Sequence, residues 1–103
     1  MPVALMPRQR AELKARAHAL EPAVYVGRAG VQDAIVSEVD KALTAHELIK
    51  MKIDADRDER AAMADIVADR TGAAVVQRVG KVVVLWRPKP ASSPEGQRGP
   101  GPQ

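Results

Sequence analysis

The residues of this chain with the clearest chemical potential are two glycines, spaced three apart, with a basic residue between them. They lie in the segment Gly27-Arg28-Ala29-Gly30, between a short apolar run and an amphipathic pattern. Because glycine has no Cβ, the backbone N–H groups of such a loop can approach an anion closely. The same glycine spacing is also common in plain turns between a strand and a helix. The pattern therefore predicts either an anion-binding loop or a simple turn.

Patterns typical of enzymes and metal sites are missing from the sequence. The chain has no cysteine, which excludes disulfides and thiolate chemistry, and His18 and His46 have no further ligands at metal-binding spacing. Acidic residues alternate over residues 54–58 as in a calcium loop, but Glu59 replaces the glycine that such a loop requires. No nucleophile elbow, phosphate-binding Walker loop or zinc-protease motif occurs. We therefore expect no enzyme activity, no metal, no cofactor and no small-molecule substrate.

Basic and acidic residues are distributed unevenly along the chain. The formal net charge is only +3, yet residues 1–28 hold five basic against two acidic residues, and residues 76–89 hold four basic and no acidic ones. Residues 54–69 hold six acidic against two basic residues. This segregation indicates one basic and one acidic region on the folded surface, with chance clustering as the alternative.

Membrane segments are not expected. The longest strictly apolar run covers only residues 82–86, far below the roughly 20 residues of a membrane span. The N-terminus lacks the basic region and long apolar core of a signal peptide. Together with the absence of cysteine, this pattern favours a cytoplasmic protein without a membrane partner.

Three helices position these residues. The first is predicted over residues 7–20. The second covers residues 31–45, and Gly30 is its expected N-cap, which offers no side-chain acceptor to the first N–H groups. The third covers residues 57–71, with Asp56 at the start of a capping-box spacing. A phosphate oxygen could take the free N–H groups of the second helix.

Four strands complete the predicted fold. The first covers residues 23–26 and the second residues 48–54, where apolar residues alternate with Lys50 and Lys52. The last two form a hairpin, residues 73–79 and 82–87. The polar face of the second strand favours helices collected on one side of the sheet. We therefore expect a two-layer α/β sandwich with a four-stranded mixed sheet, in the order α-β-α-β-α-β-β.

The two ends of the chain have a different composition. Residues 88–103 contain five prolines and three glycines and no aliphatic side chain larger than Ala91, so they cannot build a core. We expect a flexible N-terminus over residues 1–6, a folded domain over residues 7–88 and a disordered tail over residues 89–103.

A set of short pieces is spread in order over residues 5–88. The pieces are Leu13-Lys14, Ala17-His18, Leu20, Pro22, Gly27-Arg28-Ala29-Gly30, His46-Glu47-Leu48-Ile49-Lys50, Thr71-Gly72-Ala73, Val76-Gln77, Val79-Gly80-Lys81 and Leu85-Trp86-Arg87-Pro88. In combination and with compatible spacing, they resemble the YhbY-like proteins, single-domain members of the CRM (chloroplast RNA splicing and ribosome maturation) family. The family's usual Ser or Thr before the first helix is Met6 here, its usual Tyr in the last strand is Trp86, and the tail has no counterpart.

The resemblance implies a fold like the C-terminal domain of translation initiation factor three. It also implies binding to structured RNA, because bacterial members are associated with precursors of the large ribosomal subunit. The family's Gly-x-x-Gly loop is compared with the loop of KH domains, which clamps a nucleic-acid backbone. We therefore expect a monomeric protein whose partner is ribosomal RNA in a large-subunit precursor.

The resemblance assigns RNA binding first to the loop itself and second to basic residues in the matching pieces. Arg10 and Lys52 join this set because each lies close to another basic residue on a predicted helix or strand, although plain solvation explains such lysines and arginines about equally well. The predicted RNA-binding residues are Gly27, Arg28, Ala29, Gly30, Arg10, Lys14, Lys50, Lys52, Lys81 and Arg87.

Two alternatives stay open. Tyr25 and Trp86 could stack on bases, but two aromatic residues make a poor platform, and packing into the core is the favoured interpretation for both. The chain could also be a protein–protein interaction module that uses an exposed sheet edge or the acidic region of the third helix.

Overall fold

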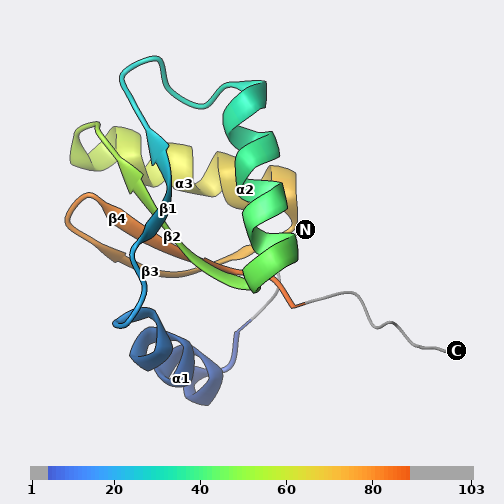
Figure 1. Ribbon diagram of the computed structural model, residues 1–103. Coiled ribbons are helices and arrows are strands. Elements are labelled where there is room, and N and C mark those ends of the chain that lie inside the picture. The colour runs from blue at the N-terminus through green and yellow to red at the C-terminus, as the bar shows by residue number, and fades with distance from the viewer. Residues whose placement is uncertain (1–4, 89–103) are drawn as a thin grey trace, which may run out of the picture.

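Three helices and four strands follow one another in the predicted order in the computed structural model (Figure 1). The structure describes residues 5–88, so the tail expected over residues 89–103, and the expected flexible N-terminus apart from Leu5 and Met6, lie outside the described residues. The elements are α1 (Pro7–Ala17), β1 (Pro22–Val26), α2 (Asp33–His46), β2 (Leu48–Ile53), α3 (Arg57–Thr71), β3 (Ala74–Val79) and β4 (Val82–Trp86).

The four strands form one mixed sheet in the order β1-β2-β4-β3. β1 pairs in parallel with β2, whereas β4 runs antiparallel to both β2 and β3. A parallel pair of neighbours needs a crossover connection, and α2 supplies it. The predicted α/β class and the four-stranded mixed sheet are confirmed.

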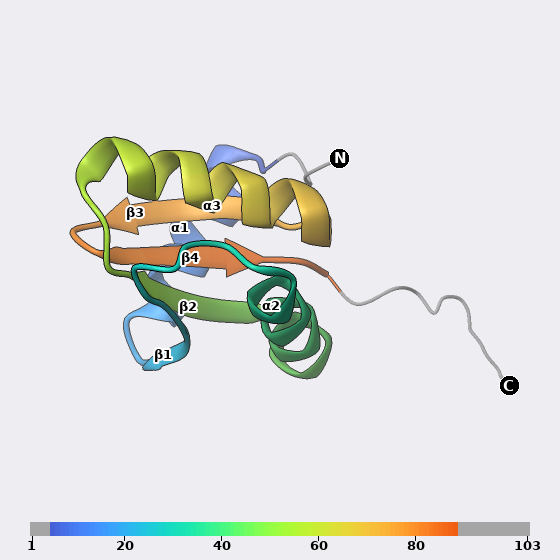
Figure 2. The same cartoon turned by 90° about the horizontal axis from the view of Figure 1, so that it is seen from above.

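Helices α2 and α3 cover one face of the sheet and enclose the main core (Figure 2). Alternate strand residues such as Val26, Met51 and Leu85 point into this core, and each of these three is completely buried. Val39 of α2 and Val67 of α3 meet them from the helical side and are also completely buried. The buried apolar residues of α2 and α3 therefore face the sheet, whereas Ile66 of α3 points to solvent and is 48% exposed.

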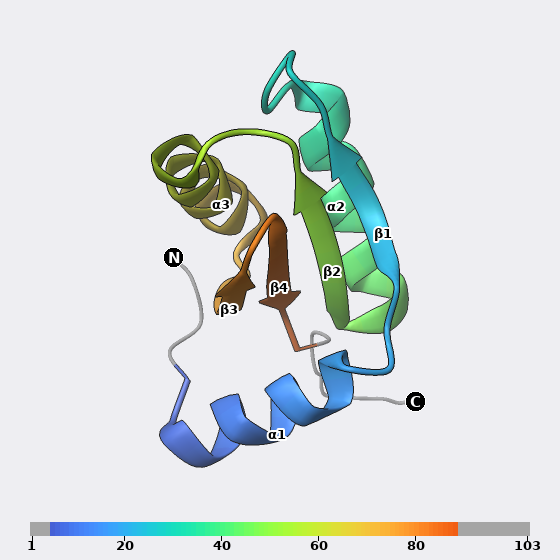
Figure 3. The ribbon, with the colours of Figure 1, turned by 90° about the vertical axis from the view of Figure 1, so that its left-hand side faces the viewer.

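Helix α1 packs on the opposite face, so the expectation that all three helices lie on one side of the sheet is wrong. Leu13 and Ala17 of α1 form a second, smaller core with Leu48, Val76 and Val84. Figure 3 shows α1 set apart from α2 and α3, with the strands between them. The physical reason is that β4 is apolar on both faces, so a helix on one side alone would leave half of its side chains in water.

The boundaries of two helices differ from the prediction. α1 ends at Ala17 rather than at residue 20. α2 begins at Asp33, two residues later than predicted. Its N-cap is Gln32, so the prediction of Gly30 as the N-cap is wrong. Gly30 has φ +82°, a left-handed conformation that belongs to the preceding turn and cannot serve as an extended N-cap.

The start of α3 is capped as predicted by an aspartate. The Glu59 N–H donates a hydrogen bond of 2.9 Å to Asp56 Oδ1. This backbone hydrogen bond from Glu59 holds the pKa of the Asp56 carboxyl below its ordinary value of 3.8. A carboxylate at the positive end of a helix also interacts favourably with the helix dipole.

The cap makes stability depend on acid in a predictable way. Because the pKa of Asp56 is lower in the folded state, its stabilising effect is complete above the unfolded pKa, near 3.8, and is lost as the pH falls through the folded pKa. We expect Asp56→Asn, which keeps a capping oxygen but no charge, to flatten the acid limb of a plot of melting temperature against pH. Asp69→Asn, in the same helix but outside the cap, should leave that limb as in the wild type. If the acid limb of Asp56→Asn were as steep as that of the wild type, this role of Asp56 would be contradicted.

Candidate nucleic-acid interface

The predicted Gly27–Gly30 loop is a tight turn at the end of β1. The Gly30 N–H donates to the Gly27 carbonyl oxygen at 3.0 Å, which closes the turn. Within residues 5–88, the N–H groups of Arg28, Ala29 and Val31 donate to no other residue. Several backbone donors are therefore available to an anion at this turn.

The two glycines have different structural roles. Gly30 needs the conformational freedom of glycine because of its positive φ. Gly27 does not: its φ lies outside the left-handed region, and an added Cβ would meet only Tyr25 Cε2, at an ordinary 3.8 Å. A glycine at position 27 therefore keeps the surface of the loop open rather than permitting the turn.

Tyr25 extends this surface from the loop onto the sheet. Its neighbours Val24 and Val26 are buried in the main core, so Tyr25 points to the other face, where it is 56% exposed. The expectation that Tyr25 packs into the core is wrong, because β1 is an edge strand and contributes no residue to the second core. Trp86 does pack against the second core, as expected.

Two predicted lysines lie on the same face as Tyr25. In the register of the sheet Lys52 is paired with Tyr25 on one side and with Val82 on the other. Lys50, two residues earlier, projects in the same direction, and Val79 extends the row onto β3. We call this row of Tyr25, Lys50, Lys52, Val79 and Val82 the open sheet face.

A groove of about 290 Å³ joins the open sheet face to α1. Lys14 of α1 and His18, the C-cap of this helix, line it together with Lys50 of β2. Its floor is apolar, formed by Ala17, Val79, Val82 and Val84. The structure thus brings Lys14, predicted from the first helix, next to lysines predicted from the second strand.

Arg28 points toward a mixed surface on the other side of the loop. It lines a hollow of about 350 Å³ together with Asp54, Asp56 and Glu59. Lys81 lies in the same hollow and forms an ion pair of 3.3 Å with Asp54. Because three carboxylates surround two cations there, a polyanion is favoured to approach the loop from the side of Tyr25.

Arg10 and Arg87 are engaged in contacts within the fold. One Arg10 guanidinium nitrogen donates to the carbonyl oxygens of Val75 (3.0 Å) and Val76 (2.6 Å), which ties α1 to the bulge in β3. Arg87 forms an ion pair of 2.6 Å with Asp40 and donates to the Thr71 carbonyl oxygen at 2.8 Å. It lies where β4 ends, at the opposite end of the sheet from the loop, so the structure does not bring Arg87 to the other predicted residues.

Sequence reasoning considers Tyr25 for base stacking but favours the core for it, and it misses Val79 and Val82 of the open sheet face. The alternation Val24-Tyr25-Val26 is the signal that could have placed Tyr25 on the face opposite the buried valines. This alternation does not show where α1 packs. Only the register of β2 and β4 shows which part of the second face of the sheet stays uncovered.

Clusters of metal ligands and membrane-spanning helices are both absent from the described part of the chain. Within residues 5–88 no group of three or more His, Cys, Asp or Glu side chains could hold a metal ion. Over the same residues no helix is long and apolar enough to cross a membrane.

Comparison with known proteins places this arrangement in a family. The family model for the CRS1 / YhbY (CRM) domain matches residues 5–87. The chain belongs to this family. Its CRM domain is 39% identical over 85 residues to a Haemophilus influenzae protein named "RNA-binding protein", covering 82% of this chain and 86% of the relative. A Pseudomonas aeruginosa protein named "Probable RNA-binding protein" is 34% identical over 89 residues, or 85% of this chain and 86% of the relative.

A solved structure resembles the fold described above. The solution structure of a hypothetical protein from Staphylococcus aureus matches with a TM-score of 0.76 at 25% sequence identity, covering 84% of this chain and 92% of that chain. The fold described above is thus similar to that of a known structure.

The different roles of the two glycines lead to a test of stability. Gly27→Ala should leave the free energy of unfolding unchanged or raise it by up to about 1 kcal/mol, because alanine restricts only the unfolded chain. Gly30→Ala should lower it by about 1–2 kcal/mol, because alanine resists a positive φ. Urea denaturation measures both. Equal destabilisation by the two substitutions would show that Gly27 is also a structural requirement.

Proposed function

We propose that this protein binds RNA and holds its phosphate backbone without catalysing a reaction. The observation that carries the proposal is one continuous surface, which runs from the groove beside α1 across the open sheet face to the Gly27–Gly30 loop. Lys14, Lys50 and Lys52 supply positive charge along it. The names of the relatives from Haemophilus influenzae and Pseudomonas aeruginosa support the same function.

Different parts of the surface make different contacts in this proposal. The free N–H groups of the loop hold phosphate oxygens, as in other backbone-clamping loops. The lysines neutralise neighbouring phosphates and release their counterions. Tyr25, exposed between the lysines and the loop, offers a flat face on which an unpaired base can stack.

We further propose that the RNA is ribosomal and that the protein acts as a monomer in the cytoplasm, on precursors of the large ribosomal subunit. This assignment rests on the resemblance to YhbY-like proteins. Cosedimentation tests it. The protein should migrate with large-subunit precursors on a sucrose gradient and leave them after nuclease treatment. Migration with soluble proteins alone, unaffected by nuclease, would favour a protein–protein interaction module instead.

Lysine substitutions test the electrostatic part of the proposal. Lys50→Gln and Lys52→Gln should each weaken binding to a ribosomal RNA fragment about five- to tenfold at low salt. Each should also reduce the slope of log K against log salt by about 0.7–0.9, because one phosphate contact is lost. Fluorescence anisotropy across a salt series measures both quantities.

Lys41→Gln is the matched control, since Lys41 is an exposed lysine on α2, on the other side of the sheet. Its affinity and its salt slope should equal those of the wild type. A wild-type affinity that does not depend on salt, or equal effects of all three substitutions, would contradict the proposed surface.

The loop is tested by comparing a charged with a neutral side chain at the same position. Gly27→Asp should weaken RNA binding at least tenfold, because a carboxylate would occupy the surface beside the free N–H groups and repel phosphate. Gly27→Ala adds a Cβ without charge and should have a much smaller effect. Circular dichroism should show both variants folded. Wild-type affinity for Gly27→Asp would exclude the loop from the interface.

A further inference from the structure

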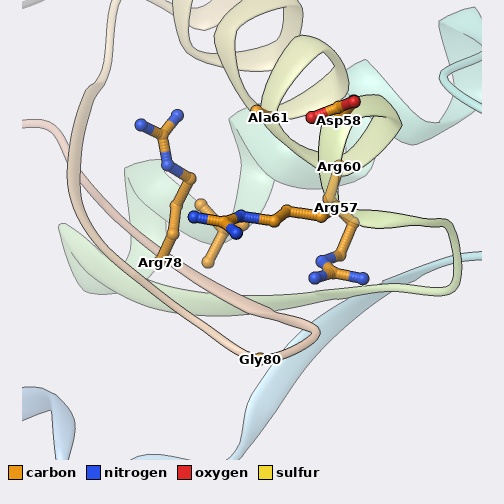
Figure 4. A pocket seen from close by; sticks show the side chains of 7 residues that line it. Arg57, Asp58, Arg60, Ala61, Arg78 and Gly80 are labelled. Atoms are coloured by element: carbon orange, nitrogen blue, oxygen red, sulfur yellow. The ribbon is translucent and has the colours of Figure 1, made fainter.

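A second basic site lies on the opposite side of the sheet from the open sheet face. Three arginines surround a pocket of about 420 Å³ between the first turn of α3 and the β3–β4 hairpin. Figure 4 shows Arg57 and Arg60 extending from α3 over the hairpin, while Arg78 rises from β3 toward the helix. Asp58 is the acidic residue in the lining, and Ala61, Gly80 and Val83 complete it.

The three guanidinium groups of this pocket form few hydrogen bonds and ion pairs within the protein. Arg60 donates to the Ala55 carbonyl oxygen at 2.5 Å. Arg78 lies 3.7 Å from Asp65 in an ion pair whose partners are 50% and 71% exposed, so this pair contributes little. The Arg57 side chain has neither a hydrogen bond nor an ion pair to any other residue within residues 5–88.

Acidic side chains of the first turn of α3 compensate part of the charge of these arginines, and Asp56 interacts electrostatically with Arg60. Arg57 and Arg60 belong to the first turns of α3, where the helix dipole is positive and cations are disfavoured. Arginines three apart on a helix are also neighbours, and Arg78 brings a third cation from the facing strand. A bound phosphate would offset this repulsion, and guanidinium groups can contact it through two parallel hydrogen bonds.

The hairpin connects this pocket to the proposed RNA surface. Arg78 and Val79 are neighbours in β3, so their side chains point to opposite faces of the sheet. Val79 belongs to the open sheet face, whereas Arg78 lines the pocket. Gly80, in the turn between them and β4, lines the pocket as well.

We propose that the pocket of Arg57, Arg60 and Arg78 is a second phosphate-binding site for RNA, whose backbone passes around the tip of the β3–β4 hairpin. This inference rests on the proposed RNA-binding function and extends the proposed RNA-binding surface to a second face of the molecule. The RNA then contacts both sides of the hairpin rather than a single flat face.

Single substitutions in the pocket test this site. Arg57→Gln and Arg78→Gln should each weaken binding of a ribosomal RNA fragment about five- to tenfold at low salt and reduce the salt slope by about 0.7–0.9. Arg57→Lys should keep the slope, because it keeps the charge. Asp58→Asn should tighten binding about twofold or more, because it removes the carboxylate that opposes the phosphate.

Arg70→Gln is the matched control, because Arg70 is an exposed arginine in the last turn of the same helix, far from the pocket. It should bind RNA like the wild type. If Arg57→Gln and Arg78→Gln match this control while Lys52→Gln still weakens binding, the second site is refuted and the proposed function stands. If the wild type itself does not bind RNA, both fail. Melting curves confirm that each variant is folded.

Discussion

The rest of the structure depends on the burial of β4 on both of its faces. This strand lies between β2 and β3, and its residues alternate between the main core and the second core. Val83 and Leu85 face α2 and α3, whereas Val84 faces α1. Since apolar side chains on both faces must be removed from water, the fold needs a helix on each side of the sheet.

The same constraint creates the candidate interface. α1 packs on the part of the second face next to Leu48 and leaves the part next to Lys52 open. The residues of β2 differ along this face in the same way: Leu48 at one end is apolar, whereas Lys50 and Lys52 follow toward the other end. The position of one short helix thus separates a packing surface from a binding surface on a single sheet.

Sequence patterns were sufficient to predict the helices and strands but not how all of them pack against one another. The 3.6-residue and two-residue periods placed the helices and strands, and the residues around Gly80 predicted the hairpin turn, where Gly80 indeed has φ +57°. They did not show that α1 lies on the second face, because only the order β1-β2-β4-β3 makes β4 an inner strand. The sequence predicts Arg10 and Arg87 as RNA contacts, but it does not show that both also bind carbonyl oxygens within the fold. A basic residue has the same pattern whether it faces solvent or binds a distant carbonyl oxygen.

The unequal size of the two cores also has a consequence for motion. α2 and α3 share the larger core, whereas α1 is held by a small cluster and by the hydrogen bonds of Arg10. Helices with few buried contacts open locally at a lower free-energy cost than the rest of a domain. The amide protons of α1 should therefore exchange with solvent sooner than those of α2 and α3. Because α1 forms one wall of the groove, the width of that groove can adapt to its occupant while the main core stays folded.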